Sequence, residues 1–158
     1  MTPISFLLVD DEQPFIETVA RRLRQRGYEV ECVFSGQAAL ERLKQGGTID
    51  VVVLDVRMPG LDGIQTVKHI RCKHPLVEVI MLTGHATIQT AVEAVKHGAL
   101  DYLEKPCELE DLIAKAQTAA QRKKIREARL FDARTKPYIS ERERSRLISE
   151  ILDSRDPV

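Results

Sequence analysis

Five short apolar runs alternate along the chain with segments in which apolar residues recur at the spacing of an amphipathic helix. The runs predict strands at residues 5–9, 28–33, 51–54, 77–82 and 100–104. Gly or Pro interrupts the helical pattern between them, as at Gly27, Pro75 and Gly98. Strands and helices that alternate in this way form right-handed βαβ units. The pattern therefore predicts an α/β fold: a (βα)5 three-layer sandwich with a central five-stranded parallel sheet, followed by a C-terminal helical tail.

Polar residues stand at the carboxyl ends of four of these runs. They are Asp10, Asp11, Asp55, Thr83 and Lys105. Asp55 taken alone is equally explained as a capping residue for the turn at Pro59 and Gly60. Parallel strands, however, bring their carboxyl ends to one edge of the sheet, where open α/β folds bind ligands. Scattered capping residues would not fall so consistently on that edge, so we interpret these residues as one site.

Three carboxylates at one edge repel each other unless a cation or protons share the site. Hard oxygen ligands with room for water match Mg²⁺, which often takes a phosphate oxygen as a further ligand. Lys105 adds an ammonium group, and Thr83 adds a hydroxyl donor. A phosphoryl group on Asp55 would thus meet a metal ion, an ammonium and a hydroxyl, as phosphoryl transfer requires. Asp55, on the central run, is the expected nucleophile.

The distribution of charge is more informative than its total. The formal net charge is zero, so the composition does not favour direct binding to nucleic acid. Residues 1–120 carry a net charge of −4 and residues 121–158 carry +4, which indicates an acidic globular part with a basic tail. The three cysteines lack a C-x-x-C spacing, as in a reducing compartment. Without a basic leader or an apolar run of about 18 residues, we expect a cytoplasmic protein with no membrane contact.

Four motifs make residues 5–120 similar to the receiver domain of bacterial two-component response regulators. They are Val9-Asp10-Asp11-Glu12, Leu54-Asp55-Val56-Arg57-Met58-Pro59-Gly60, Met81-Leu82-Thr83-Gly84 and Asp101-Tyr102-Leu103-Glu104-Lys105-Pro106. The resemblance implies a flavodoxin-like fold and a phosphorelay role, in which Asp55 accepts a phosphoryl group from a histidine kinase or phosphotransfer protein. It implies Mg²⁺ as the cofactor, held by Asp55, by Asp11 directly, by Asp10 through water and by the backbone carbonyl of Arg57. Such a chain is not an enzyme beyond self-catalysed phosphotransfer and autodephosphorylation.

The same resemblance implies a switch. Thr83 and Lys105 would contact the phosphoryl oxygens, and Tyr102 would swing inward on activation. The Lys105-Pro106 bond would be cis. Tyr102 is also explained as a half-buried strand aromatic. Arg57 and His85 would lie near the path of an attacking water and tune the lifetime of the phosphoryl group, unless both are solvated loop residues.

Receivers of the nitrogen-regulation type are the most similar, through the run Thr83-Gly84-His85-Ala86 and the helix that follows it. Such receivers normally precede an ATPase domain and a helix-turn-helix. Here no G-x-x-x-x-G-K-[ST] motif occurs, and residues 121–158 are too few for either module. We therefore expect a receiver domain at 1–120 and a helical tail at 121–158. This stand-alone receiver would act through protein–protein contacts with a target that the sequence does not identify.

The tail leaves several interpretations open. The basic run at 121–129 is by default the solvated end of the fifth helix, with a dimerising helix or a weak anion-binding patch as alternatives. The first alternative would make a homodimer. Ser140 and Glu143 have the spacing of a capping box. An apolar stripe follows at Leu147, Ile148, Ile151 and Leu152. This stripe needs a surface to lie against: its own receiver, a second subunit or a partner.

Three other functions fit the residues less well. Aspartate-nucleophile phosphatases carry a second acid two residues after the nucleophile, where this chain has Arg57. A flavin or nucleotide binder has a Gly- or Ser/Thr-rich phosphate loop after the first strand, where this chain has Asp10-Asp11-Glu12. A phosphorylation-independent interaction module would keep the fold without needing the acids. The complete set of acceptor residues favours a phosphorylation-controlled switch.

Overall fold

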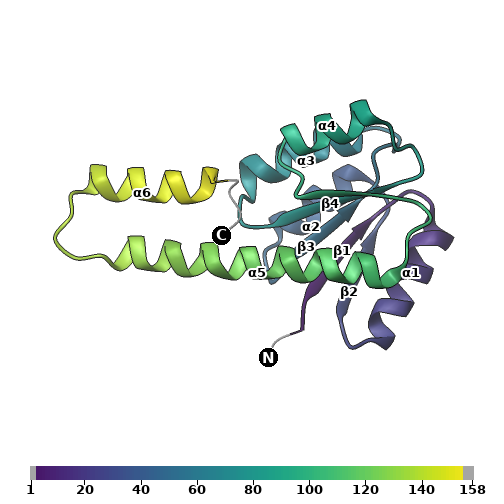
Figure 1. Ribbon diagram of the computed structural model, residues 1–158, viewed down its shortest axis with the longest axis horizontal. Coiled ribbons are helices and arrows are strands. Elements are labelled where there is room, and N and C mark those ends of the chain that lie inside the picture. Colours follow the sequence, from purple (N-terminus) through teal and green to yellow (C-terminus); the bar gives the residue numbers. More distant parts are fainter. Residues whose placement is uncertain (1–2, 155–158) are drawn as a thin grey trace.

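The apolar runs form one parallel sheet in the computed structural model, which describes residues 3–154 (Figure 1). Its strands are β1 (Ser5–Val9), β2 (Glu29–Val33), β3 (Val51–Leu54), β4 (Glu78–Thr83) and β5 (Asp101–Glu104). Within the described residues the strands lie in the order β2-β1-β3-β4-β5, and every neighbouring pair is parallel. The predicted five-stranded parallel sheet is confirmed.

Helices cover both faces of this sheet (Figure 1). They are α1 (Gln13–Gln25), α2 (Gly36–Lys44), α3 (Gly63–Lys73), α4 (Ile88–Lys96), α5 (Leu109–Thr135) and α6 (Glu141–Asp153). The core on one face takes residues from α1 and α5, and the core on the other takes residues from α2, α3 and α4. In β1, Leu7 packs into one core and its neighbour Leu8 into the other. Burial on both faces explains why the strands read as apolar runs rather than as alternating patterns.

Two helix starts have a serine at the N-cap, and one of them, Ser140, is the capping residue predicted from the sequence. The side chain of Ser35 accepts the Ala38 N–H at 3.1 Å, and that of Ser140 accepts the Glu143 N–H at 3.1 Å. Each bond satisfies an N–H group that has no partner within its helix. These positions were predictable because the N-cap preference acts locally, through residues close in sequence.

The chain continues α5 well past position 120 and then folds back into α6. The second half of α5 extends beyond the sheet, and α6 runs antiparallel beside it (Figure 1). Leu130 and Ala133 of α5 are buried, and the apolar stripe of α6 is half-buried. The stripe therefore lies against α5 of its own chain. Although α5 has 27 residues, neither it nor any other described helix is apolar enough to cross a bilayer.

Arg126 overturns the interpretation of the basic run as a solvated helix end. Its side chain is 2% exposed, and its Nη1 lies 3.2 Å from Oε1 of Glu78, which is 3% exposed. The same guanidinium donates to the carbonyls of Ile151 and Leu152, at 3.4 and 2.7 Å. Those carbonyls belong to the last turn of α6, which lacks intrahelical donors. Arg126 thus joins the first residue of β4 to the end of α6.

Replacing Arg126 with Ala removes one partner of this buried pair. We expect the free energy of unfolding to fall by about 3 kcal/mol, the lower end of the range for such pairs, because Arg122 stays 3.8 Å from Glu78. Urea denaturation followed by circular dichroism measures this loss. The matched control is Arg129→Ala, an exposed position on the same helix, which should cost less than about 0.5 kcal/mol. Equal losses in the two variants would contradict a stabilising role for the buried contacts of Arg126.

Candidate functional site

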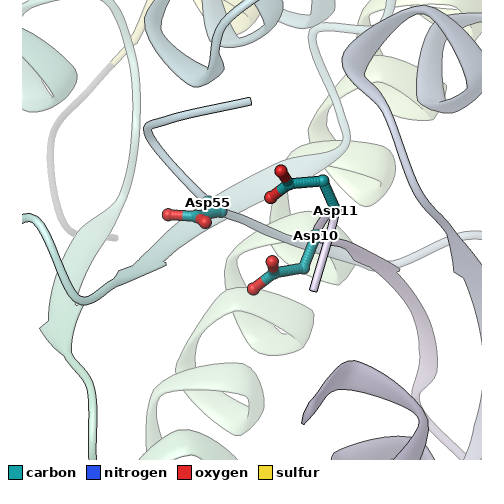
Figure 2. A group of neighbouring side chains, drawn as sticks. All are labelled: Asp10, Asp11 and Asp55. Carbon is teal, nitrogen blue, oxygen red and sulfur yellow. The ribbon is translucent and has the colours of Figure 1, made fainter. Parts of the chain in front are cut away.

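The register between β1 and β3 brings two acids side by side. Val9 pairs with Leu54, and the Asp55 N–H donates to the Val9 carbonyl at 3.1 Å. The residues that follow the paired ones, Asp10 and Asp55, are both buried, whereas Asp11 is exposed. One carboxylate oxygen from each of the three acids lies within 4.8 Å of the others. Figure 2 shows the three side chains gathered at the ends of these two strands.

The start of α3 fixes the backbone beyond Asp55. The Gly63 N–H donates to the Val56 carbonyl at 2.8 Å. A Cβ atom at Gly63 would lie 2.1 Å from the Asp55 carbonyl oxygen and 2.8 Å from the Val56 Cα. Such contacts are far inside van der Waals distance and involve backbone atoms, which cannot move aside as a flexible side chain can. Glycine is therefore required here for the helix to approach the acidic residue so closely.

Thr83 and Lys105 reach the same edge from β4 and β5. Thr83 ends β4 and is fully buried, and it pairs with Glu104 of β5. The next residue, Lys105, donates its backbone N–H to the Thr83 carbonyl at 2.9 Å. The Lys105-Pro106 bond is cis, as the resemblance implied. All the polar residues singled out at strand ends therefore lie on one edge, as predicted.

The ammonium group of Lys105 lies among the acids. Its Nζ is 2.6 Å from Oδ2 of Asp10, 3.6 Å from Oδ2 of Asp55 and 3.4 Å from Oε1 of Glu12. It also lies 4.3 Å from the centroid of the Phe15 ring, within cation–π range. This one cation offsets part of the repulsion between the carboxylates, and its shortest contact is to Asp10 rather than to Asp55.

The pKa values of the closest pair shift in the same direction for different reasons. Burial raises the pKa of Asp10, and the hydrogen bonds from Lys105 and from the Glu12 N–H only partly oppose it. Burial alone would lower the pKa of Lys105, but the hydrogen bond to Asp10 and the nearby negative charges outweigh it and raise that pKa. The lysine is therefore held in its charged form by the acids around it.

Asp55 carries an unsatisfied atom. Its side chain is 2% exposed, and among the described residues its Oδ1 has no hydrogen-bond partner. A buried charged oxygen without a partner is costly, so such an atom in a native site usually points to a missing ligand. Three carboxylates around it form a hard oxygen donor set, which suits Mg²⁺. The residues present therefore fit a divalent cation.

The site opens into a cleft of about 390 Å³. Asp11, Asp55, Arg57 and His85 contribute to its lining. Arg57 and His85 are both exposed. Both residues therefore stand at the exposed part of the cleft that Asp55 also lines.

Comparison with known proteins identifies the fold family. Residues 6–117 match the model of the response regulator receiver domain. The chain belongs to the response regulator receiver family. The receiver occupies most of the chain, and the matched part ends within α5, before the helix leaves the sheet.

Two relatives of this receiver come from bacteria. The chain is 40% identical over 116 residues to the transcriptional regulatory protein ZraR of Escherichia coli K12, covering 73% of this chain and 26% of that protein. It thus spans about a quarter of the length of that curated relative. A receiver domain protein of Clostridium thermocellum is 34% identical, with a TM-score of 0.73, over 77% of this chain and 98% of that one.

A third relative has a similar fold and carries a phosphorylated residue. This is a response regulator protein from Burkholderia pseudomallei, whose crystal structure holds a phosphorylated aspartic acid, a calcium ion and citrate. It is 34% identical to this receiver, with a TM-score of 0.68, over 79% of this chain and 73% of that one.

Sequence reasoning missed three residues that contact the receiver's polar side chains. Glu12 and Phe15 both contact the Lys105 ammonium. Thr90 Oγ1 lies 2.9 Å from the hydroxyl of Tyr102, a half-buried residue packed against one core. Glu12 directly follows Asp10 and Asp11 in one of the receiver motifs, so its position in the sequence could have indicated that it lies near the site. Phe15 and Thr90 lie on helices, and nothing in the sequence indicates which strand residue each one meets.

Substitution of Gly63 tests how tightly the fold holds Asp55. We expect Gly63→Ala to lower the free energy of unfolding by about 2–3 kcal/mol, because the added methyl group displaces the backbone at Asp55. Thermal unfolding measures the loss. Gly84→Ala is the control, since a Cβ atom there meets nothing within 4 Å. A Gly63→Ala variant as stable as the Gly84→Ala variant would contradict the close approach.

Proposed function

We propose that this receiver is a signalling phosphoacceptor and that Asp55 takes the phosphoryl group. A carboxylate oxygen of Asp55 would form a bond to phosphorus while the bond between phosphorus and the imidazole nitrogen of the donor breaks. The observation that carries the proposal is the buried carboxylate of Asp55: its Oδ1 has no hydrogen-bond partner among residues 3–154, its Oδ2 lies 3.6 Å from the Lys105 ammonium, and two further acids lie close by. Asp10 is engaged with Lys105 and the Glu12 N–H, which leaves Asp55 as the better nucleophile.

Mg²⁺ is the cofactor that this donor set fits best. Asp11, Asp55 and the backbone carbonyl of Arg57 would hold it, with Asp10 acting through water. When bound, it would supply positive charge that offsets the carboxylates and the incoming phosphoryl oxygens. The exposed position of Asp11 leaves room for the water ligands that Mg²⁺ retains.

Lys105 and Thr83 would bind the phosphoryl group once it is in place. Lys105 already lies 3.6 Å from Asp55, so a small rotation of its side chain brings the ammonium to a phosphoryl oxygen. The Thr83 hydroxyl is buried and accepts the His85 N–H at 3.0 Å, which leaves its proton free to be donated. Arg57 and His85, which line the cleft, would set how readily water reaches the acyl phosphate.

The output of this switch would pass through protein contacts. A histidine kinase or phosphotransfer protein would supply the phosphoryl group, and the surface near Tyr102 and α4 would change its partner. Residues 1–120 would form the receiver unit and residues 121–158 a helical extension. The phosphorylated aspartic acid in the Burkholderia pseudomallei relative supports the chemistry.

Intact mass spectrometry tests the phosphoacceptor directly. After incubation with a small-molecule phosphodonor and Mg²⁺, we expect a single phosphoryl group on the wild-type chain, and none in Asp55→Asn or with excess chelator. Asp132→Asn, an exposed acid on α5, is the control and should be labelled like the wild type. Undiminished labelling of Asp55→Asn would refute the assignment.

Thermal unfolding tests the metal ligands independently of phosphorylation. A cation that binds the folded chain alone adds about 2.7 kcal/mol of stability at a hundred times its dissociation constant. We therefore expect Mg²⁺ to raise the melting temperature in a saturable way at constant ionic strength. Asp11→Asn should reduce this shift, and Asp132→Asn should keep it. An undiminished shift in Asp11→Asn would place the cation elsewhere.

A further inference from the structure

Helix α4 begins with a reciprocal pair of threonines. The side chain of Thr87, the N-cap, accepts the Thr90 N–H at 3.0 Å, and the side chain of Thr90 accepts the Thr87 N–H at 3.0 Å. This is a capping box in which threonine replaces the usual glutamate or glutamine at the third helical position. An ionised glutamate only accepts hydrogen bonds, whereas a threonine hydroxyl that accepts one still has a proton to donate.

The Thr90 hydroxyl also meets a group from outside its helix. Its Oγ1 lies 2.9 Å from the hydroxyl of Tyr102 in β5 and 3.1 Å from the Thr87 carbonyl. Both contacts are satisfied when Tyr102 donates to Thr90 and Thr90 donates to that carbonyl. A hydroxyl at this position can do both at once, and a methyl group can do neither. Thr90 therefore ties the Tyr102 ring to the first turn of α4.

The same turn is tied to the phosphoryl site. The Thr83 hydroxyl accepts the N–H of His85, which stands two residues before the N-cap Thr87. Polar contacts therefore lie on both sides of a short backbone segment: the Thr83 hydroxyl contacts His85, two residues before Thr87, and Thr87 contacts Thr90, which contacts the Tyr102 hydroxyl. A phosphoryl oxygen that accepts a hydrogen bond from the Thr83 hydroxyl would act on the first of these contacts.

The helix at the far end of these contacts carries an unusual surface. Ile88, Val92 and Val95 of α4 are 87%, 61% and 49% exposed, at the spacing of one helix face. Movement of the first turn of α4 would move these apolar side chains with it. A link between Tyr102 and α4 thus ties this half-buried aromatic to the exposed surface of the receiver.

We propose that Thr90 is a positioning residue, which holds the Tyr102 hydroxyl against the start of α4 and so couples Thr83 to Tyr102. This inference rests on the proposed function, because the signal at Thr83 is the phosphoryl group on Asp55. The alternative is that Thr90 only caps the helix, in which case Tyr102 would behave the same without it.

Tyrosine fluorescence separates the two roles, since the chain has no tryptophan and three tyrosines. In a Tyr28→Phe, Tyr138→Phe background, Tyr102 is the only tyrosine left. Quenching of its fluorescence by acrylamide reports how exposed its ring is. Loss of one hydrogen bond shifts the balance between ring positions by about fivefold. We expect Thr90→Val to increase quenching of Tyr102 and to reduce the change caused by beryllofluoride with Mg²⁺, a phosphoryl mimic.

Two controls isolate the hydroxyl. Thr90→Ser keeps it and should restore the behaviour of the background protein. Thr87→Ala weakens the cap of α4 and removes the 2.9 Å contact between the Thr87 and Thr90 hydroxyls. It leaves the Thr90 hydroxyl facing Tyr102, so quenching should stay close to that of the background. Equal quenching of the Thr90→Val and background proteins, with and without beryllofluoride, would overturn the proposal. So would a Thr87→Ala change as large as that of Thr90→Val.

Fluorine NMR shows whether beryllofluoride binds, and this separates a failure of the proposed phosphoacceptor function from a failure of the role of Thr90. If the background protein binds none, the proposed function fails, and quenching of the metal-free proteins still decides whether Thr90 holds Tyr102. If beryllofluoride binds and Thr90→Val changes nothing, the proposed function stands and the role of Thr90 is refuted.

Discussion

The parallel register of β1 and β3 is the constraint on which the site depends. Because Val9 pairs with Leu54, the residues beyond them, Asp10 and Asp55, come abreast, with Asp11 close by. Both strands are buried on both faces, so a slip of one residue would exchange every side chain between the two cores. The fold therefore holds the acids together against their repulsion, and Lys105 offsets only part of it. The repulsion that remains between the carboxylates favours binding of a cation.

Much of this arrangement was predictable because it follows from local patterns. Apolar runs identify strands buried on both faces, and Ser140 identifies the start of a helix. Parallel topology then brings all carboxyl ends to one edge, so the positions of Asp55, Thr83 and Lys105 relative to one another follow without knowledge of any distance. The motifs then indicate the receiver family within this fold class, because their order and spacing along the chain are specific to it.

Other features depend on contacts between elements, and no local pattern encodes these. Arg126 stands in a basic run that suits a solvated helix, yet α6 and the start of β4 bury it. Its burial depends on where the chain folds back after α5, which the sequence pattern does not define. Thr90 is likewise an ordinary capping partner until the neighbouring strand brings Tyr102 to its hydroxyl. The contacts of Phe15 and Glu12 with Lys105 arise in the same way.

The most direct measurement of the central claim is the chemical location of the phosphoryl group. Borohydride reduces an aspartyl phosphate to homoserine and leaves free carboxylates unchanged. Cleavage after basic residues then releases a peptide of residues 45–57, which holds both Asp50 and Asp55. Tandem mass spectrometry should find homoserine at position 55 after treatment with phosphodonor and Mg²⁺, and aspartate at position 50. Homoserine at position 50 or outside this peptide, with aspartate intact at 55, would contradict the account.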